Sequence, residues 1–127
     1  MIRTLLLIPA AALAVSALAA HAAERPQVAA AFGNTVMSVY DDGRSQKVWL
    51  KDDGTWTGLS RRGNPLAGKW STKGDQVCLR QSKPPTLPIS FCRPFPADPE
   101  KGIDTKDITG AHIHLKLVKG HIGESQG

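Results

Sequence analysis

The 127-residue sequence lacks the short motifs by which common enzyme classes are recognised. It has no G-x-S-x-G turn, no H-E-x-x-H zinc motif, no phosphate-binding loop and no dinucleotide fingerprint. Beyond residue 22 the only histidines are 112, 114 and 121, so serine and cysteine side chains have no evident neighbouring base. The sequence therefore predicts a non-catalytic protein that needs no cofactor.

The first 22 residues have the pattern of a secretory signal peptide. Arg3 precedes an apolar run from Leu5 to Ala20, and Ala20-His21-Ala22 fits the small-x-small cleavage rule. A membrane anchor is the alternative, but the run is rich in alanine and ends in a cleavage site. We therefore expect a periplasmic or secreted chain that begins near Ala23 and does not stay inserted in a membrane.

Cysteine is also scarce, with only Cys78 and Cys92 in the whole chain. Two cysteines in an oxidising compartment favour a disulfide. A redox pair or a thiolate metal site would need C-x-x-C spacing or further ligands, which the sequence does not offer.

No segment after residue 22 sustains a helical hydrophobic period. Short runs rich in valine, threonine and tryptophan alternate instead with turn signals, among them Asp42-Gly43 and Asp53-Gly54. The pattern predicts an all-β antiparallel meander of about six to eight strands, either a curled sheet or a small up-and-down barrel. Its expected parts are a leading segment at 23–33, one domain at 34–120 and a disordered tail at 121–127. The paired aspartates at 41–42 and 52–53 are expected to serve the turns rather than catalysis.

Tryptophan recurs at 49, 56 and 70. If the Asp-Gly turns are two-residue loops, Val36 pairs with Trp49 and Trp49 pairs with Gly58. A five-residue loop at 61–65 then pairs Trp56 with Trp70. This register places all three indoles on one face, with Val48 and Leu50 on the other. The row is expected to be core, and a stacking platform for a ligand is the alternative.

The segment 111–120 alternates clearly and is expected to be the closing strand, with Ile113, Leu115 and Leu117 inside. His112 and His114 then share the outer face, and His121 follows after a turn. Two or three imidazoles can hold Zn²⁺ or Cu²⁺, so a periplasmic metal-binding protein is one alternative function. An ordinary polar outer face is the simpler interpretation.

Basic residues are frequent between 61 and 93, a segment that contains seven Lys and Arg but only one acidic residue, Asp75. Arg61, Arg62, Lys69 and Arg80 form the candidate anion-binding patch, which would suit an anionic component of the cell envelope or a protein. Aggregation-resistant strand edges explain the same charges. Export makes nucleic acid an unsuitable partner.

The motifs Asp-Gly-Thr-Trp-x-Gly, Gly-x-Trp and Gly-Asp-x-Val-Cys-Leu, followed by a second cysteine, resemble those of small exported bacterial β-domain proteins. The resemblance covers residues 34–93 and implies a periplasmic β-domain, with no catalytic residue to transfer. A weaker resemblance to periplasmic lysozyme inhibitors implies inhibition of a cell-wall lytic enzyme. The Ser-Gly-x-x-Tyr loop of that family is absent here, and the basic charge is unfavourable for docking on a basic enzyme. The main expectation is a binding module of unknown ligand.

Overall fold

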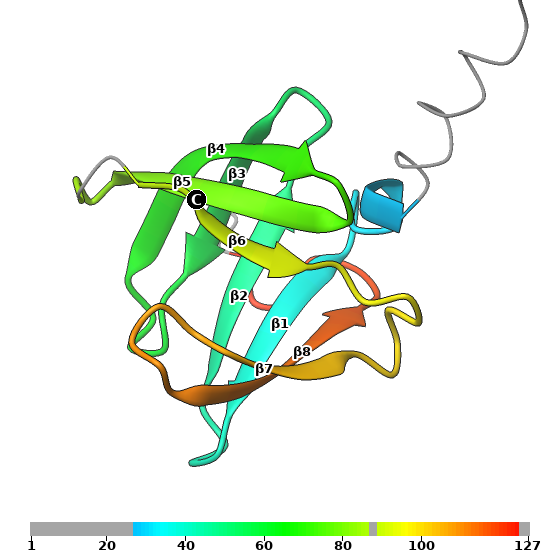
Figure 1. Cartoon of the computed structure of the whole chain (residues 1–127). Helices are drawn as coiled ribbons and strands as arrows, with labels where there is room; N and C mark the ends of the chain where they lie inside the picture. Colours follow the sequence, from blue (N-terminus) through cyan, green and yellow to red (C-terminus); the bar gives the residue numbers. More distant parts are fainter. Residues whose placement is uncertain (1–26, 87–88, 125–127) are drawn as a thin grey trace, which may run out of the picture.

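The computed structural model describes residues 27–86 and 89–124 as one curled antiparallel sheet of eight strands (Figure 1). The strands are β1 (Thr35–Tyr40), β2 (Ser45–Leu50), β3 (Thr55–Leu59), β4 (Pro65–Lys73), β5 (Gln76–Lys83), β6 (Phe91–Pro94), β7 (Ile103–Lys106) and β8 (His112–Val118). Their order across the sheet is β6-β5-β4-β3-β2-β1-β8-β7, a half-barrel whose edges are β6 and β7. The predicted all-β class is confirmed.

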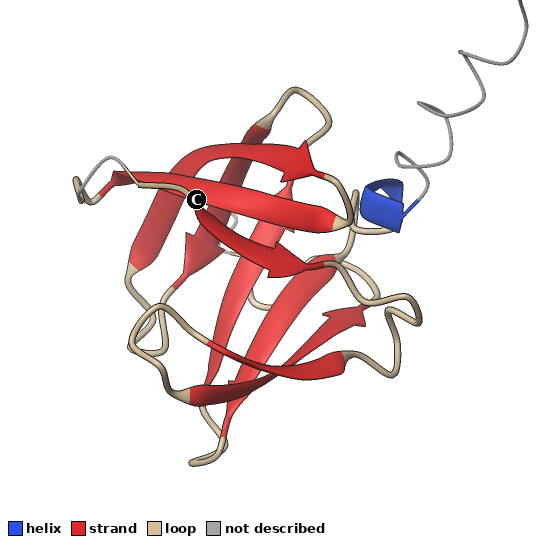
Figure 2. Cartoon of the chain, in the orientation of Figure 1, coloured by secondary structure: helices blue, strands red, loops and turns tan. Residues whose placement is uncertain are grey.

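Strands account for nearly all the regular structure described (Figure 2). The exception is one helical turn at residues 27–29. The described part of the chain contains no helix of the length and apolarity that crossing a membrane requires. The predicted signal peptide, residues 1–22, lies outside the described residues.

Four of the hairpins use the same turn, and that turn sets the register of the sheet. In the first, Gly43 N–H donates to Tyr40 O and Tyr40 N–H donates to Arg44 O, which encloses a three-residue loop. The loops ending at Gly54, Gly63 and Gly110 repeat both hydrogen bonds. The third loop residue has φ between 80° and 87° in all four, a conformation that glycine adopts without steric cost.

The predicted register is wrong because the loops have three residues rather than two or five. Val36 pairs with Val48 instead of Trp49, and Trp49 pairs with Thr57 instead of Gly58. Trp56 pairs with Gly68, and Trp70 with Leu79. A shift of one residue reverses the face to which a strand's side chains point. Trp49 therefore lies on the outer face, whereas Trp56 and Trp70 share the inner one.

Val48 and Leu50 change face for the same reason. They lie inside the half-barrel, where Leu50 and Trp56 form the buried cluster together with Ala31. Ala31 belongs to the segment that follows the helical turn, and it is completely buried. Phe32 of this segment packs against Trp70 with ring centroids 5.7 Å apart. The predicted leading segment thus closes one end of the half-barrel.

Trp49 is only 2 % exposed although it lies on the outer face, because the chain after β8 covers it. Its indole N–H donates to Thr35 Oγ1 at 2.9 Å, and Ile122 N–H donates to the same oxygen at 2.9 Å. The His121 ring lies 6.1 Å from the indole. Residues 121–124 are therefore packed against the sheet, where a disordered tail was expected; residues 125–127 lie outside the described residues.

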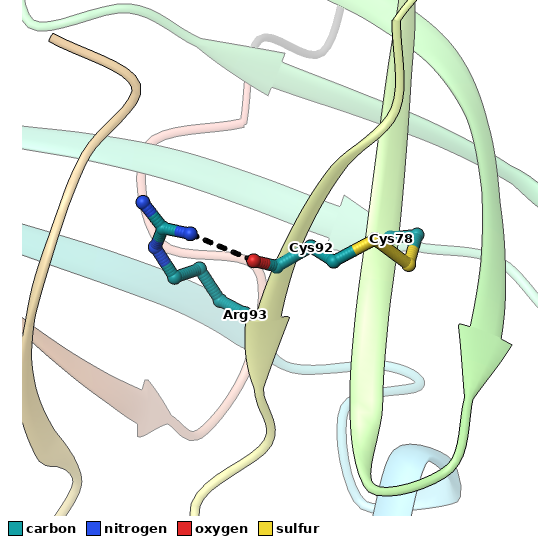
Figure 3. Close-up of a disulfide and its surroundings, with 3 residues drawn as sticks. All are labelled: Cys78, Cys92 and Arg93. Carbon is teal, nitrogen blue, oxygen red and sulfur yellow. Dashed lines mark hydrogen bonds between the residues drawn. A yellow bond between two sulfur atoms is a disulfide. The ribbon is translucent and has the colours of Figure 1, made fainter.

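The disulfide between Cys78 and Cys92 is confirmed. The two cysteines are direct partners across β5 and β6, so the bond fixes the edge strand β6 to the sheet. Closing a loop of this length stabilises a domain by about 3 kcal/mol in the chain-entropy model. The next residue, Arg93, extends to the opposite side of β6 from the sulfur atoms (Figure 3).

Arg93 spans the two edges of the half-barrel. Its guanidinium donates to the carbonyl oxygen of Lys106 at 2.5 Å and to that of Asp107 at 3.4 Å. It also donates to Cys92 O at 2.8 Å, the bond drawn in Figure 3. Side-chain hydrogen bonds thus connect β6 to the end of β7, where the backbone ladder stops.

Candidate binding cavity

The inner face of the half-barrel lines an open cavity of about 780 Å³. Its wall is formed mainly by apolar side chains from all the strands except β7: Val36, Val48, Leu50, Trp56, Leu66, Val77, Leu79, Phe91, Ile113 and Leu115. Eight-stranded sheets that curl on themselves have an interior wide enough for one small ligand. The volume lies within the range of about 300 to 1,000 Å³ that is usual for ligand pockets.

One end of the cavity is blocked, and the other is bordered by loops. The blocked end is the one that residues 31–32 close, and Phe95 packs against the core cluster there as well. The β3–β4, β5–β6 and β7–β8 connections border the opposite end, where Ile89 and Ile108 line the cavity and are 58 % and 64 % exposed. Large apolar side chains at an opening are favourable for a ligand with an apolar surface. We call this end the mouth.

Polar side chains at the mouth form a connected group. Tyr40 OH donates to Asp107 Oδ2 at 2.8 Å, and the Arg61 guanidinium lies 3.9 Å from the centre of the Tyr40 ring. Arg93 is bonded to the backbone of the same Asp107. Arg61, Arg93 and Tyr40 therefore meet at one place on the cavity wall.

The charges of Tyr40 and Asp107 are fixed by this arrangement. Burial, followed by the hydrogen bond to Asp107, raises the pKa of Tyr40 to about 12, so the phenol stays protonated. Burial alone would raise the pKa of Asp107, but hydrogen bonds from Thr109 and Tyr40 outweigh it and lower that pKa. Asp107 Oδ1 also accepts from Ala111 N–H, so this oxygen holds the β7–β8 turn while Oδ2 accepts from Tyr40.

The predicted tryptophan row is divided between two faces. Trp56 lines the cavity and is 3 % exposed, with its indole N–H donating to Lys69 O at 3.1 Å. Trp70 is on the same face but packs at the closed end against Phe32. Trp49 is outside and covered. A continuous stacking platform of three indoles is therefore wrong, and Trp56 alone contacts the cavity.

The predicted basic patch is also divided. Lys69 and Arg80 are direct partners on the exposed outer face, as expected. Arg61 and Arg62 belong instead to the β3–β4 loop and line the cavity mouth. The four side chains do not form one surface.

The structure brings His112 and His114 together but leaves His121 apart. Both rings contact Asp104 Oδ1, at 3.2 Å and 3.0 Å, and His112 Nδ1 lies 2.7 Å from Asp41 Oδ1. From His114 to Val118 the strand advances about 13 Å at roughly 3.3 Å per residue, and His121 lies beyond that. His121 contacts Glu124 instead. Across residues 27–86 and 89–124, no three His, Cys, Asp or Glu side chains are grouped in a way that could hold a metal ion, so the three-histidine site is wrong.

The pair His112 and Asp104 predicts a pH-dependent contribution to stability. The hydrogen bond that His112 donates to Asp41 raises the pKa of His112 above its ordinary value, and the hydrogen bond that Asp104 accepts from His114 lowers the pKa of Asp104. A raised histidine pKa stabilises the fold fully below the unfolded value and loses that contribution as pH rises through the folded value. The lowered pKa of Asp104 stabilises the fold above the unfolded pKa of this carboxyl, and that contribution is lost only as pH falls through the folded value.

We therefore expect His112→Asn to lower the melting temperature more at about pH 5 than at about pH 8. Scanning calorimetry of both proteins at the two pH values measures the difference. The same loss at both pH values would show that protonated His112 does not stabilise the fold.

Comparison of the chain with protein-family models, with curated proteins and with solved structures gives no match. Two neighbouring strands, β1 and β2, have apolar residues on both faces, which indicates a sheet that curls but not a hollow interior. No sequence pattern indicated Tyr40, Arg93 or Asp107 as site residues, because they lie in three separate segments that only the fold brings together.

Proposed function

We propose that this protein is an exported, non-catalytic binding module that holds a small, largely apolar molecule inside the half-barrel. The observation that carries the proposal is the cavity of about 780 Å³ with its apolar wall. A closed end and a mouth with two exposed apolar side chains, Ile89 and Ile108, favour a ligand that enters lengthwise. Burial of apolar surface supplies about 25 cal/mol per Å², so a ligand of this class needs few polar contacts.

Export is supported by two independent features. The N-terminal pattern is that of a signal peptide, and the disulfide is of the kind that persists in oxidising compartments. A periplasmic or secreted binding module would meet amphipathic molecules of the envelope or of the medium.

The absence of catalysis is supported by the chemistry of the cavity wall. The titratable side chains that line it are Tyr40, Asp107 and three arginines. Both oxygens of Asp107 accept hydrogen bonds, and the phenol of Tyr40 keeps its proton at neutral pH. Neither group is suited to general base catalysis there. The described histidines lie outside, on β8 and beyond it.

The cavity can be tested by filling it. Ser38 lines the cavity from the middle of β1, so Ser38→Phe should occupy part of its volume. Ser45 lies on the neighbouring strand and does not line it, so Ser45→Phe is a matched control for the same chemical change. We expect the wild type and Ser45→Phe to bind the neutral fluorescent probe N-phenyl-1-naphthylamine, and Ser38→Phe to bind it at least tenfold more weakly.

Fluorescence titration and a thermal melt of each variant decide the outcome. Equal probe affinity for all three folded proteins would place the probe elsewhere and contradict the proposed cavity. Failure of the folded wild type to bind the probe would contradict the proposed function itself.

A further inference from the structure

The mouth contains more positive charge than the structure neutralises. Arg61, Arg62 and Arg93 line the cavity, and Asp107 is the carboxylate among them. Within the described residues no carboxylate lies within ion-pair distance of any of the three arginines. Both acidic residues of the adjoining β1–β2 turn have other partners, since Asp42 is paired with Arg44 and Asp41 Oδ1 lies 2.7 Å from His112 Nδ1. A ligand that enters the cavity therefore passes a net positive field.

Arg61 is held so that its hydrogen-bonding edge stays available. The guanidinium carbon lies over the Tyr40 ring, 3.9 Å from the ring centre, and this cation–π contact occupies none of the N–H groups as a hydrogen bond to an oxygen would. No hydrogen bond joins these N–H groups to another described residue. A guanidinium in this state can bind a carboxylate or a phosphate oxygen pair in bidentate fashion. Tyr40 cannot turn away, because it is buried and bonded to Asp107.

We propose that the ligand is an amphipathic anion, whose apolar tail lies in the cavity and whose oxyanion head group pairs with Arg61 at the mouth. This inference rests on the proposed function and adds to it the chemical class of the ligand. Arg62, exposed in the same loop, and Arg93, on the adjoining wall, strengthen the positive field. Arg93 keeps its own hydrogen bonds to the backbone, so its contribution is electrostatic.

The experiment compares four ligands that have the same ten-carbon tail and different head groups. Decanoate, decyl phosphate, decanol and decylammonium are each used to displace N-phenyl-1-naphthylamine, at concentrations that form no micelles. We expect decanoate to displace the probe about tenfold more effectively than decanol, as a charge-assisted pair allows, and decylammonium to be the weakest. Decanoate and decyl phosphate test the two sources of the oxyanion, and the tighter of them identifies the head group.

Arg61→Met keeps the length and apolar stem of the side chain while removing its charge. It should abolish the preference for decanoate over decanol, measured as the ratio of the two affinities so that any change in probe affinity cancels. Arg80→Met, on the exposed outer face, is the matched control and should keep the preference. If Arg61→Met does not fold, the wild type still provides a test, since raising ionic strength to about 0.5 M should weaken decanoate but not decanol.

The outcomes separate this inference from the proposed function. If the probe binds the wild type and decanol competes as well as decanoate, the cavity binds apolar molecules and the inferred anion site is wrong. If Arg80→Met loses the preference as Arg61→Met does, the anion binds the outer face and the inference is again wrong. Failure of the probe to bind the folded wild type would contradict the proposed function first.

Discussion

Replacing Trp56 with alanine is expected to lower the free energy of unfolding by about 3 to 5 kcal/mol, the cost of truncating a buried aromatic side chain. Trp56 is 3 % exposed and belongs to the buried cluster with Leu50 and Ala31. The substitution also removes the donor to Lys69 O. Because small domains are stable by only about 5 to 15 kcal/mol, much of the total would be lost. Urea denaturation followed by circular dichroism measures it.

Trp70→Ala is the control for this measurement. Trp70 lies on the same face, but it is partly exposed and its indole N–H donates to Lys51 O in an exposed position. We expect a loss clearly smaller than that of Trp56→Ala. If Trp56→Ala instead kept its stability and lost probe binding, Trp56 would be a ligand platform that contributes little to the core.

The fold class could be predicted because its signals are local. Glycine-containing turns at short intervals, strand-forming residues between them and the alternation in 112–118 each depend on a few neighbouring residues. The same local pattern predicted Ile113, Leu115 and Leu117 inside, which is where the sheet holds them.

The register could not be predicted because a loop that is longer by a single residue changes the pairing of the strands. An Asp-Gly pair fits both a two-residue loop and the end of a three-residue loop, in which glycine is the third residue. The backbone hydrogen bond of Gly43 to Tyr40 O selects the longer loop, and every partner in β1 and β2 then shifts by one. Trp49 moved to the outer face for this reason. The strand β7 (Ile103–Lys106) was missed because it has only four residues and two of them are charged, a composition that also suits a loop.

The cavity could not be predicted because it depends on closure of the sheet. An apolar side chain that points inward has the same sequence pattern whether the interior is filled or hollow. Closure brings β6 and β7 close enough for Arg93 to reach Lys106 O, and it brings Arg61 over Tyr40. These contacts join residues of four separate segments, so neither spacing nor charge pattern indicated them.

The last prediction concerns Gly68, where two strands approach too closely for any side chain. A Cβ atom there would lie 1.9 Å from Arg80 O and 2.7 Å from Trp56 Nε1. The contact with Arg80 involves backbone, so β4 and β5 would have to separate next to the irregular pairing at Ala67 and Gly68. We expect Gly68→Ala to cost about 3 kcal/mol or more, at the upper end of overpacking effects. Urea denaturation again measures the loss.

Gly63→Ala distinguishes this steric cause from ordinary glycine flexibility. Gly63 has φ of 80° and open space around it, so its substitution should cost only the backbone strain of about 1 to 2 kcal/mol. Backbone conformation alone would make Gly63 the more sensitive position, because the φ of Gly68 is not positive. Adding Trp56→Phe to Gly68→Ala should restore no stability, since the carbonyl of Arg80 remains in place. A cost for Gly63→Ala equal to that for Gly68→Ala, or rescue by Trp56→Phe, would show that β4 and β5 are not packed this closely.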